Sequence, residues 1–287
     1  MHGVLEINLL GPTQVVVDGR PVPIAAPRRQ VALSALALTP GRTVSTGALA
    51  RYLWGEEVPA LARRAISTIV TRLRHDLGTD VVAGMTGGYR LIAPPQTVDV
   101  YRFRALVGAA RTAGTDAGAE LDLLDRALGC WRGEPLQDVS SEWLVAEYAP
   151  GLAEEWYAAT ERRLDLLLDA GRHGDLLPQL RDLTARQPLR ESLWCRLMVA
   201  LYRAGRQAEA LQAYQSVREV LVSQLGVGPG AELRGLRRAV LADDPALGAG
   251  LSSTPDPVLV GARISSDLAG RRSGGLSCDT DCRCPAR

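Results

Sequence analysis

The chain has 287 residues, of which 46% are hydrophobic and 23% charged, a composition typical of a globular protein long enough for two domains. No apolar run reaches the length of a membrane span and the N-terminus lacks a signal-peptide pattern, so we expect a cytoplasmic protein with no membrane partner. Residues 1–95 carry 10 Arg and 6 acidic residues, whereas residues 96–248 carry 18 Arg and 22 acidic residues. This split favours one part that binds nucleic acid and another that faces protein.

The first 60 residues predict a small antiparallel sheet followed by two helices. Asp18-Gly19 is a strong hairpin signal, because it separates two β-prone runs. Pro27 suits the start of the first helix, and Ser45 is the expected N-cap of the second. The predicted strands are 4–10, 14–17 and 20–24, and the predicted helices are 28–38 and 46–54.

The segment 62–78 is the most informative part of the chain, because it predicts a helix that reads DNA. Its apolar residues recur at helical spacing and would bury one face. The opposite face is cationic and carries hydroxyl groups, with no carboxylate near its centre, and such side chains suit base edges and phosphates in a major groove. The residues predicted to face bases are Arg64, Ser67, Thr68, Thr71, Arg72 and His75. The alternative is an Arg-rich, solvated helix with no specific role.

Two short β-prone runs follow this helix, at 81–82 and 89–92. Gly84, Gly87 and Gly88 lie between them, which predicts a hairpin with a glycine-containing tip. A basic helix followed at once by such a hairpin is the element order of a winged helix. The predicted phosphate contacts from the helix flank and the wing are Arg63, Arg74, Thr86 and Arg90.

Almost every segment from about residue 96 to residue 248 has helical period. Residues 170–180 realign with residues 204–214 at an offset of 34, the tetratricopeptide period, with Gly171 and Gly205 at the turn between two helices. Helix pairs of this kind stack and leave a concave surface, commonly for protein. The predicted helices are 99–113, 119–131, 142–148, 152–170 and a capping helix at 231–241, with a break at Pro150-Gly151.

The expected fold is therefore mainly α with a small β part. It comprises a winged-helix DNA-binding domain at 1–95, an all-α tetratricopeptide-like domain at 96–248 and a disordered tail at 249–287. Three scattered His, no nucleophile motif and no P-loop predict that the chain is not an enzyme and has no catalytic residue or cofactor. No metal is expected either, since the spacing of Cys278, Cys282 and Cys284 matches no strong metal motif.

Several motifs give the chain a resemblance to a known family. In the first part they are Leu10-Gly-Pro12, Pro27-Arg-Arg29, Leu53-Trp-Gly55, Thr71-Arg-Leu-Arg74 and Gly87-Gly-Tyr-Arg-Leu91. In the second part they are Ala127-Leu-x-x-Trp-Arg-Gly-Glu-Pro-Leu136, Pro188-Leu-Arg-Glu191, Leu201-Tyr-Arg-x-Gly-Arg-Gln-Ala-Glu-Ala-Leu211 and Leu225-Gly-Val-x-Pro-Gly230. Over about residues 3–247 the chain resembles a small Streptomyces antibiotic regulatory protein, a transcriptional activator.

This resemblance implies a response-regulator-type winged helix followed by a bacterial transcriptional activation domain. It implies binding, as a homodimer, to direct repeats of double-stranded DNA upstream of antibiotic biosynthetic genes, and recruitment of RNA polymerase. By resemblance to winged-helix activators, Glu56 and Glu57 are the expected contact for polymerase or its sigma factor; the alternative is a solvated loop with no partner. Two alternatives remain open: an adaptor whose helical repeats bind a partner protein, and a repressor that uses the same DNA-binding domain.

Overall fold

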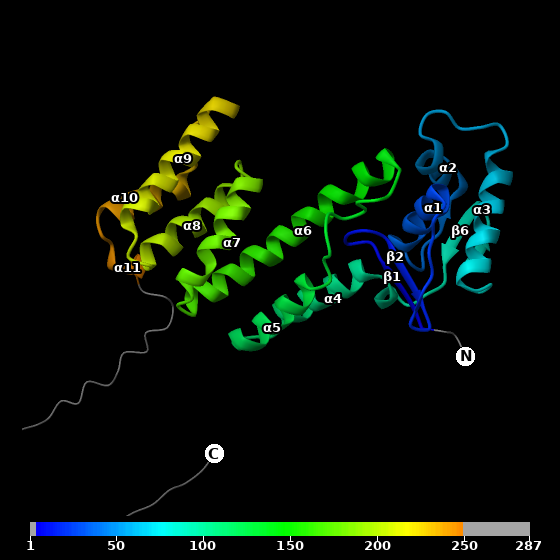
Figure 1. Ribbon diagram of the computed structural model, residues 1–287, viewed down its shortest axis with the longest axis horizontal. Helices are drawn as coiled ribbons and strands as arrows, with labels where there is room; N and C mark the ends of the chain where they lie inside the picture. Colours follow the sequence, from blue (N-terminus) through cyan, green and yellow to red (C-terminus); the bar gives the residue numbers. More distant parts are fainter. Residues whose placement is uncertain (1–3, 249–287) are drawn as a thin grey trace, which may run out of the picture. The chain divides into compact units, whose positions relative to one another are not determined.

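The computed structural model describes residues 4–248 of the chain. The predicted disordered tail at 249–287, with its three cysteines, lies outside the described residues. Within the described part the fold class is as predicted, with two small antiparallel sheets and three helices followed by helices alone (Figure 1).

The N-terminal sheet consists of β1 (Leu5–Asn8), β2 (Gln14–Val17) and β3 (Arg20–Pro21), paired in that order. Leu5 pairs with Val17 and Asn8 with Gln14, so all four residues of β1 are matched. Asp18 and Gly19 both have positive φ, 51° and 75°, as a two-residue type I′ turn requires. The predicted hairpin is confirmed.

Three helices and a second sheet complete the winged helix. The helices are α1 (Pro27–Ala37), α2 (Thr46–Trp54) and α3 (Ala62–Leu77); the strands are β4 (Val44–Ser45), β5 (Val82–Met85) and β6 (Gly88–Leu91), in the order β4-β6-β5. Ser45 accepts a hydrogen bond from the Ala48 N–H at 3.1 Å and is the predicted N-cap of α2. Strand β4 was not predicted, because two residues show no period.

The rest of the described chain is helical, and consecutive helices such as α7, α8 and α9 pack against one another (Figure 1). Its elements are the 3₁₀ turn η1 (Pro95–Thr97) and the helices α4 (Asp99–Arg111), α5 (Ala117–Leu128), α6 (Glu142–Asp169), α7 (His173–Arg186), α8 (Glu191–Arg203), α9 (Gln207–Leu225), α10 (Ala231–Leu241) and α11 (Pro245–Gly248). Helices α6 and α8 end 34 residues apart, and α7 and α9 begin 34 residues apart. Gly171 and Gly205 have φ of 78° and 73° at the intervening turns, so the predicted repeat is confirmed.

The predicted break at Pro150-Gly151 is wrong, because α6 runs through it as one helix of 28 residues. Pro150 has no N–H to bond the carbonyl of Ala146, which costs the helix one hydrogen bond. Both residues are exposed, so water can serve that carbonyl. Leu144 and Leu152 are buried on either side and hold both halves of α6 in place.

Two hydrophobic cores meet along α6. The first includes side chains from β1 through the winged helix and continues into α4, α5 and α6, as far as Leu166. The second contains side chains of α6 to α10, from Leu164 to Val240. The first core thus includes residues on both sides of the proposed boundary at residue 95, and that boundary stays a prediction.

Asp99 joins the N-terminal sheet to α4. Its side chain is 1% exposed and accepts hydrogen bonds at 2.8 Å from the backbone N–H groups of Leu9 and Leu10, just after β1. Burial raises the pKa of Asp99, and the N–H groups of Leu10 and Leu9 oppose that rise. On the other side, Ser141 donates a hydrogen bond to the carbonyl of Tyr52 at 2.6 Å, which ties α6 to α2.

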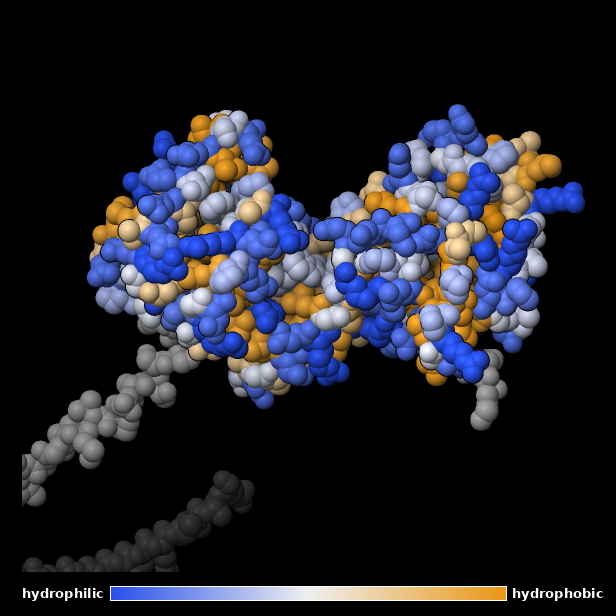
Figure 2. All heavy atoms as spheres, viewed as in Figure 1, coloured by the Kyte–Doolittle hydropathy of each residue, from blue (hydrophilic) through white to orange (hydrophobic). Residues whose placement is uncertain are grey.

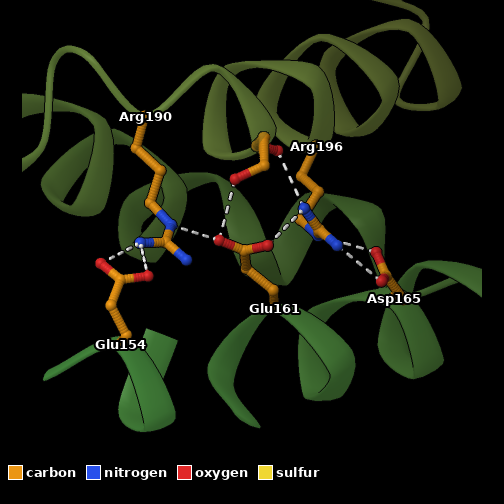
Figure 3. A network of polar contacts seen from close by, with 6 residues as sticks. Glu154, Glu161, Asp165, Arg190 and Arg196 are labelled. Carbon is orange, nitrogen blue, oxygen red and sulfur yellow. Dashed lines mark hydrogen bonds and ion pairs between the residues drawn. The ribbon is translucent and has the colours of Figure 1, made fainter. Parts of the chain in front are cut away.

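A network of ion pairs attaches α8 to α6 (Figure 3). Glu161 of α6 accepts hydrogen bonds from Arg190 and Arg196. Asp165 accepts two more from Arg196, from its Nε at 2.8 Å and its Nη2 at 2.7 Å. Glu154 accepts from the other end of Arg190 at 2.9 Å. Fork-shaped pairs of this kind fix orientation as well as distance, so the network sets the angle between the two helices.

Candidate nucleic-acid interface

Helix α3 presents the face that the sequence predicts for DNA. Ala62, Ile66, Val70, Leu73 and Leu77 are buried and recur every three or four residues, so the helix has one direction toward the core. All six residues predicted to face bases are exposed: Arg64, Ser67, Thr68, Thr71, Arg72 and His75. The structure brings these side chains onto one exposed side of a single helix.

This face is positively charged because its one acid is neutralised. Asp76 of α3 forms an ion pair with Arg29 of α1, and both side chains are mostly buried. Among the residues that the structure describes, no carboxylate lies within 4 Å of the guanidinium groups of Arg63, Arg64 or Arg72. In the helical part, by contrast, most arginines pair with acids, as in Figure 3. Unpaired arginines on an exposed helix can bind phosphate or base edges without first losing a partner.

The two threonine hydroxyls already have a backbone partner. Thr68 donates to the carbonyl of Arg64 at 3.1 Å, and Thr71 donates to that of Ser67 at 2.9 Å. Each oxygen keeps lone pairs that can accept a hydrogen bond from a base amino group. Rotation of the hydroxyl about its Cβ–Oγ bond would let it donate to a base acceptor instead. The hydroxyls are thus held in place without being used up.

The wing is the hairpin of β5 and β6. Thr86 and Gly87 form its turn, Thr86 is exposed, and Gly87 has φ of 80°. Gly88 lies against β4, where a Cβ would come within 2.1 Å of the carbonyl oxygen of Val44. Only glycine fits that position, so the motif that predicted the wing tip also allows the third strand.

The four predicted phosphate contacts differ in their surroundings. Arg63 is exposed at the start of α3. Arg74 is half-buried, and its Nε donates to the carbonyl of Val82 at 2.8 Å, so it also fastens the wing to α3. Arg90 is half-buried, and its buried Nε has no hydrogen-bond partner.

Sequence reasoning missed Arg28 of α1, a cationic side chain that lies beside α3. The guanidinium carbon of Arg28 lies 5.5 Å from the centre of the Trp54 ring, a cation–π contact. Both line a cleft of about 550 Å³ together with Thr68 and Arg72 of α3. The signal was present in the motifs at Pro27 and Leu53, but only folding brings α1 and the end of α2 to the side of α3.

The loop between α2 and α3 carries Glu56 and Glu57, both exposed. Two large apolar side chains beside them are also exposed, Val58 at 47% and Leu61 at 70%. Exposed apolar groups flanked by charge are typical of protein contacts. Sequence reasoning named the two acids and missed the apolar pair.

None of the helices between residues 4 and 248 combines the length and apolar character that a membrane span needs. In the same range, no three His, Cys, Asp or Glu side chains converge as metal ligands would.

Comparisons with known proteins identify the family of the chain. Residues 98–241 match the family described as the bacterial transcriptional activator domain. The chain is 39% identical over 279 residues to the regulatory protein AfsR of Streptomyces coelicolor, an alignment that covers 94% of this chain and 28% of AfsR. It is 38% identical over 259 residues to the regulatory protein DnrI of Streptomyces peucetius, covering 85% of this chain and 94% of DnrI.

A solved structure has the same fold. It is that of Mycobacterium tuberculosis EmbR in complex with a low affinity phosphopeptide, with a TM-score of 0.80 and 33% sequence identity. The match covers 86% of this chain and 68% of that chain. With its winged helix, its helical repeat and these relatives, the chain belongs to the Streptomyces antibiotic regulatory protein family of transcriptional activators.

Proposed function

We propose that this chain binds direct repeats of double-stranded DNA upstream of the promoters of an antibiotic biosynthetic gene cluster and activates transcription there. The observation that carries the proposal is the exposed face of α3, whose arginines have no carboxylate partner and whose one acid is paired with Arg29. The target cluster follows from the family resemblance. In this proposal residues 1–95 are the DNA-binding domain, residues 96–248 are the activation domain, and the chain acts in the cytoplasm.

In this proposal α3 enters the major groove and the wing follows the backbone. Thr68, Thr71 and His75 face base edges, and Arg64 and Arg72 reach bases or phosphates. Arg63, Arg74, Thr86 and Arg90 contact phosphate, which adds affinity without sequence preference.

A genome-wide map of bound DNA, made with the full chain, gives the site and tests the reading helix. Thr68→Ala and Thr71→Ala should each cost about 1–3 kcal/mol on the mapped site and relax its preference at one position. Thr112→Ala is the matched control, because Thr112 is also an exposed threonine whose hydroxyl donates to its own helix. If both α3 variants keep the affinity and preference of the control, α3 is not the reader.

Salt dependence tests the phosphate contacts. Arg63→Ala should weaken binding to all sequences alike and reduce the slope of log affinity against log salt by about one. Arg126→Ala on α5, also exposed, should leave the slope unchanged. Binding that does not weaken with salt would support the adaptor alternative.

Tandem sites test the homodimer. Two half-sites in the same orientation, with centres about 10.5 bp apart, place both protomers on one side of the duplex. The full chain should then bind the pair more tightly than one half-site, because the second contact is intramolecular. Equal affinity for one and two half-sites would contradict dimeric binding.

The loop of Glu56 and Glu57 is the proposed contact for polymerase or its sigma factor. The double change Glu56→Ala and Glu57→Ala should lower transcription in a purified system and leave DNA affinity unchanged. Glu219→Ala, an exposed acid on α9, is the control. Transcription that falls when the wild-type chain is added would identify a repressor.

A further inference from the structure

A cavity of about 590 Å³ lies between α4 and α6, away from the proposed DNA-reading face. Its apolar wall is formed by Phe103 and Val107 of α4 and by Ala158 of α6. Figure 2 shows apolar surface among polar side chains where these helices lie. The other lining side chains are charged: Arg104, Arg111, Glu154, Glu155 and Arg190. A cavity with an apolar wall beside charged groups suits a small molecule that has both an apolar body and a charge.

Gly108 keeps the α4 side of the cavity open. It lies in the interior of α4, where glycine is disfavoured relative to alanine. A Cβ added there would meet nothing within 4 Å, so close packing does not require the glycine. The residue therefore contributes empty space at the wall of the cavity.

The charges at the rim leave one cation without a partner. Glu155 accepts two hydrogen bonds from Arg104, from its Nε at 2.8 Å and its Nη2 at 2.7 Å. Glu154 accepts from Arg190 at 2.9 Å, as Figure 3 shows. Arg111 also lines the cavity and is exposed, and no carboxylate of the described residues lies within 4 Å of its guanidinium. The rim thus carries an excess positive charge at Arg111.

We propose that this cavity binds a small organic monoanion. Its apolar body packs on Val107 and Ala158, above the buried Phe103, and its carboxylate or sulfonate pairs with Arg111. Phe103 belongs to the core shared with the winged helix, whereas Arg190 begins the segment that attaches α8 to α6. An anion bound between α4 and α6 lies beside both, and so gives the helical part a chemical input that is separate from DNA reading.

The probe for this site is 8-anilinonaphthalene-1-sulfonate, an aromatic monoanion whose fluorescence rises in apolar surroundings. Titration of the full chain should give saturable binding, and Gly108→Leu, which fills the cavity, should lower the affinity at least tenfold. The matched control is Gly235→Leu, because Gly235 lies inside α10 and a Cβ there also meets nothing within 4 Å. Circular dichroism and melting temperature establish that each variant is folded.

The cation is tested with a second pair of variants. Arg111→Gln should weaken binding of the sulfonate about fivefold, the range of an exposed ion pair, whereas Arg218→Gln, at an exposed arginine of α9, should not. The uncharged probe N-phenyl-1-naphthylamine should bind Arg111→Gln as it binds wild type and should lose affinity for Gly108→Leu. Unchanged sulfonate affinity in either Gly108→Leu or Arg111→Gln overturns the proposal. Because DNA binding is not part of this assay, its failure is distinct from failure of the proposed function.

Discussion

Replacing Asp99 tests how firmly the winged helix is attached to the helical part. In Asp99→Ala the N–H groups of Leu9 and Leu10 lose their acceptor in a site where the aspartate is 1% exposed. A buried donor without a partner costs about 1–3 kcal/mol, so two of them predict a loss of about 2–6 kcal/mol in the free energy of unfolding. That is a large share of the roughly 5–15 kcal/mol by which a domain is stable.

Urea unfolding of the full chain, followed by circular dichroism, measures this loss. The matched control is Asp138→Ala, since Asp138 accepts two hydrogen bonds from Thr13 in an exposed place and its loss should cost about 1 kcal/mol or less. Amide hydrogen exchange should speed up at residues 5–10 and 98–103 together in Asp99→Ala. If Asp99→Ala unfolds at the same urea concentration as Asp138→Ala, the buried carboxylate does not join the two parts.

Three further outcomes follow from the structure. Gly88→Ala should lower the melting temperature by several degrees and weaken DNA binding, because its Cβ would meet the Val44 carbonyl at 2.1 Å; Gly84→Ala, whose nearest contact is 3.8 Å away, should change little. A fragment of residues 1–95 should show no cooperative thermal transition, because its core lacks Phe103, Leu124 and Leu144; a sharp transition would contradict this. The hydrogen bonds from Arg162 lower the pKa of Glu120, so their contribution to stability should be complete above the ordinary carboxyl pKa of about 4.3 and lost as pH falls through the lowered value. Glu120→Gln should remove that acid dependence, as measured by melting temperature from pH 3 to pH 7.

The sequence predicted the elements whose signals are local. Asp18-Gly19 sets its own turn, the apolar spacing in α3 defines which face is exposed, and the 34-residue offset locates the repeat. The break at Pro150 was predicted from a local rule that packing overrode, because buried leucines on both sides keep α6 helical through it.

Contacts between distant segments had no local signal. Leu9 and Asp99 are 90 residues apart, and nothing near either of them shows that one will accept a hydrogen bond from the other. Arg28 and Trp54 likewise meet only after α1 and α2 have packed. For the candidate site, the sequence could therefore predict which face of α3 is exposed, but not the neighbours that complete the surface.

The core shared by β1, α4 and α6 has a consequence for promoter geometry. A DNA-binding domain on a flexible linker could place its activation domain on any side of the duplex. Here Asp99, Ser141 and a common core fix the orientation of the helical part relative to the winged helix. Moving the operator by half a turn of DNA, about 5 bp, would place the helical part on the opposite side of the duplex from the promoter. Output should then rise and fall with operator position at the period of the double helix, so that phase as well as distance decides which promoters the protein serves.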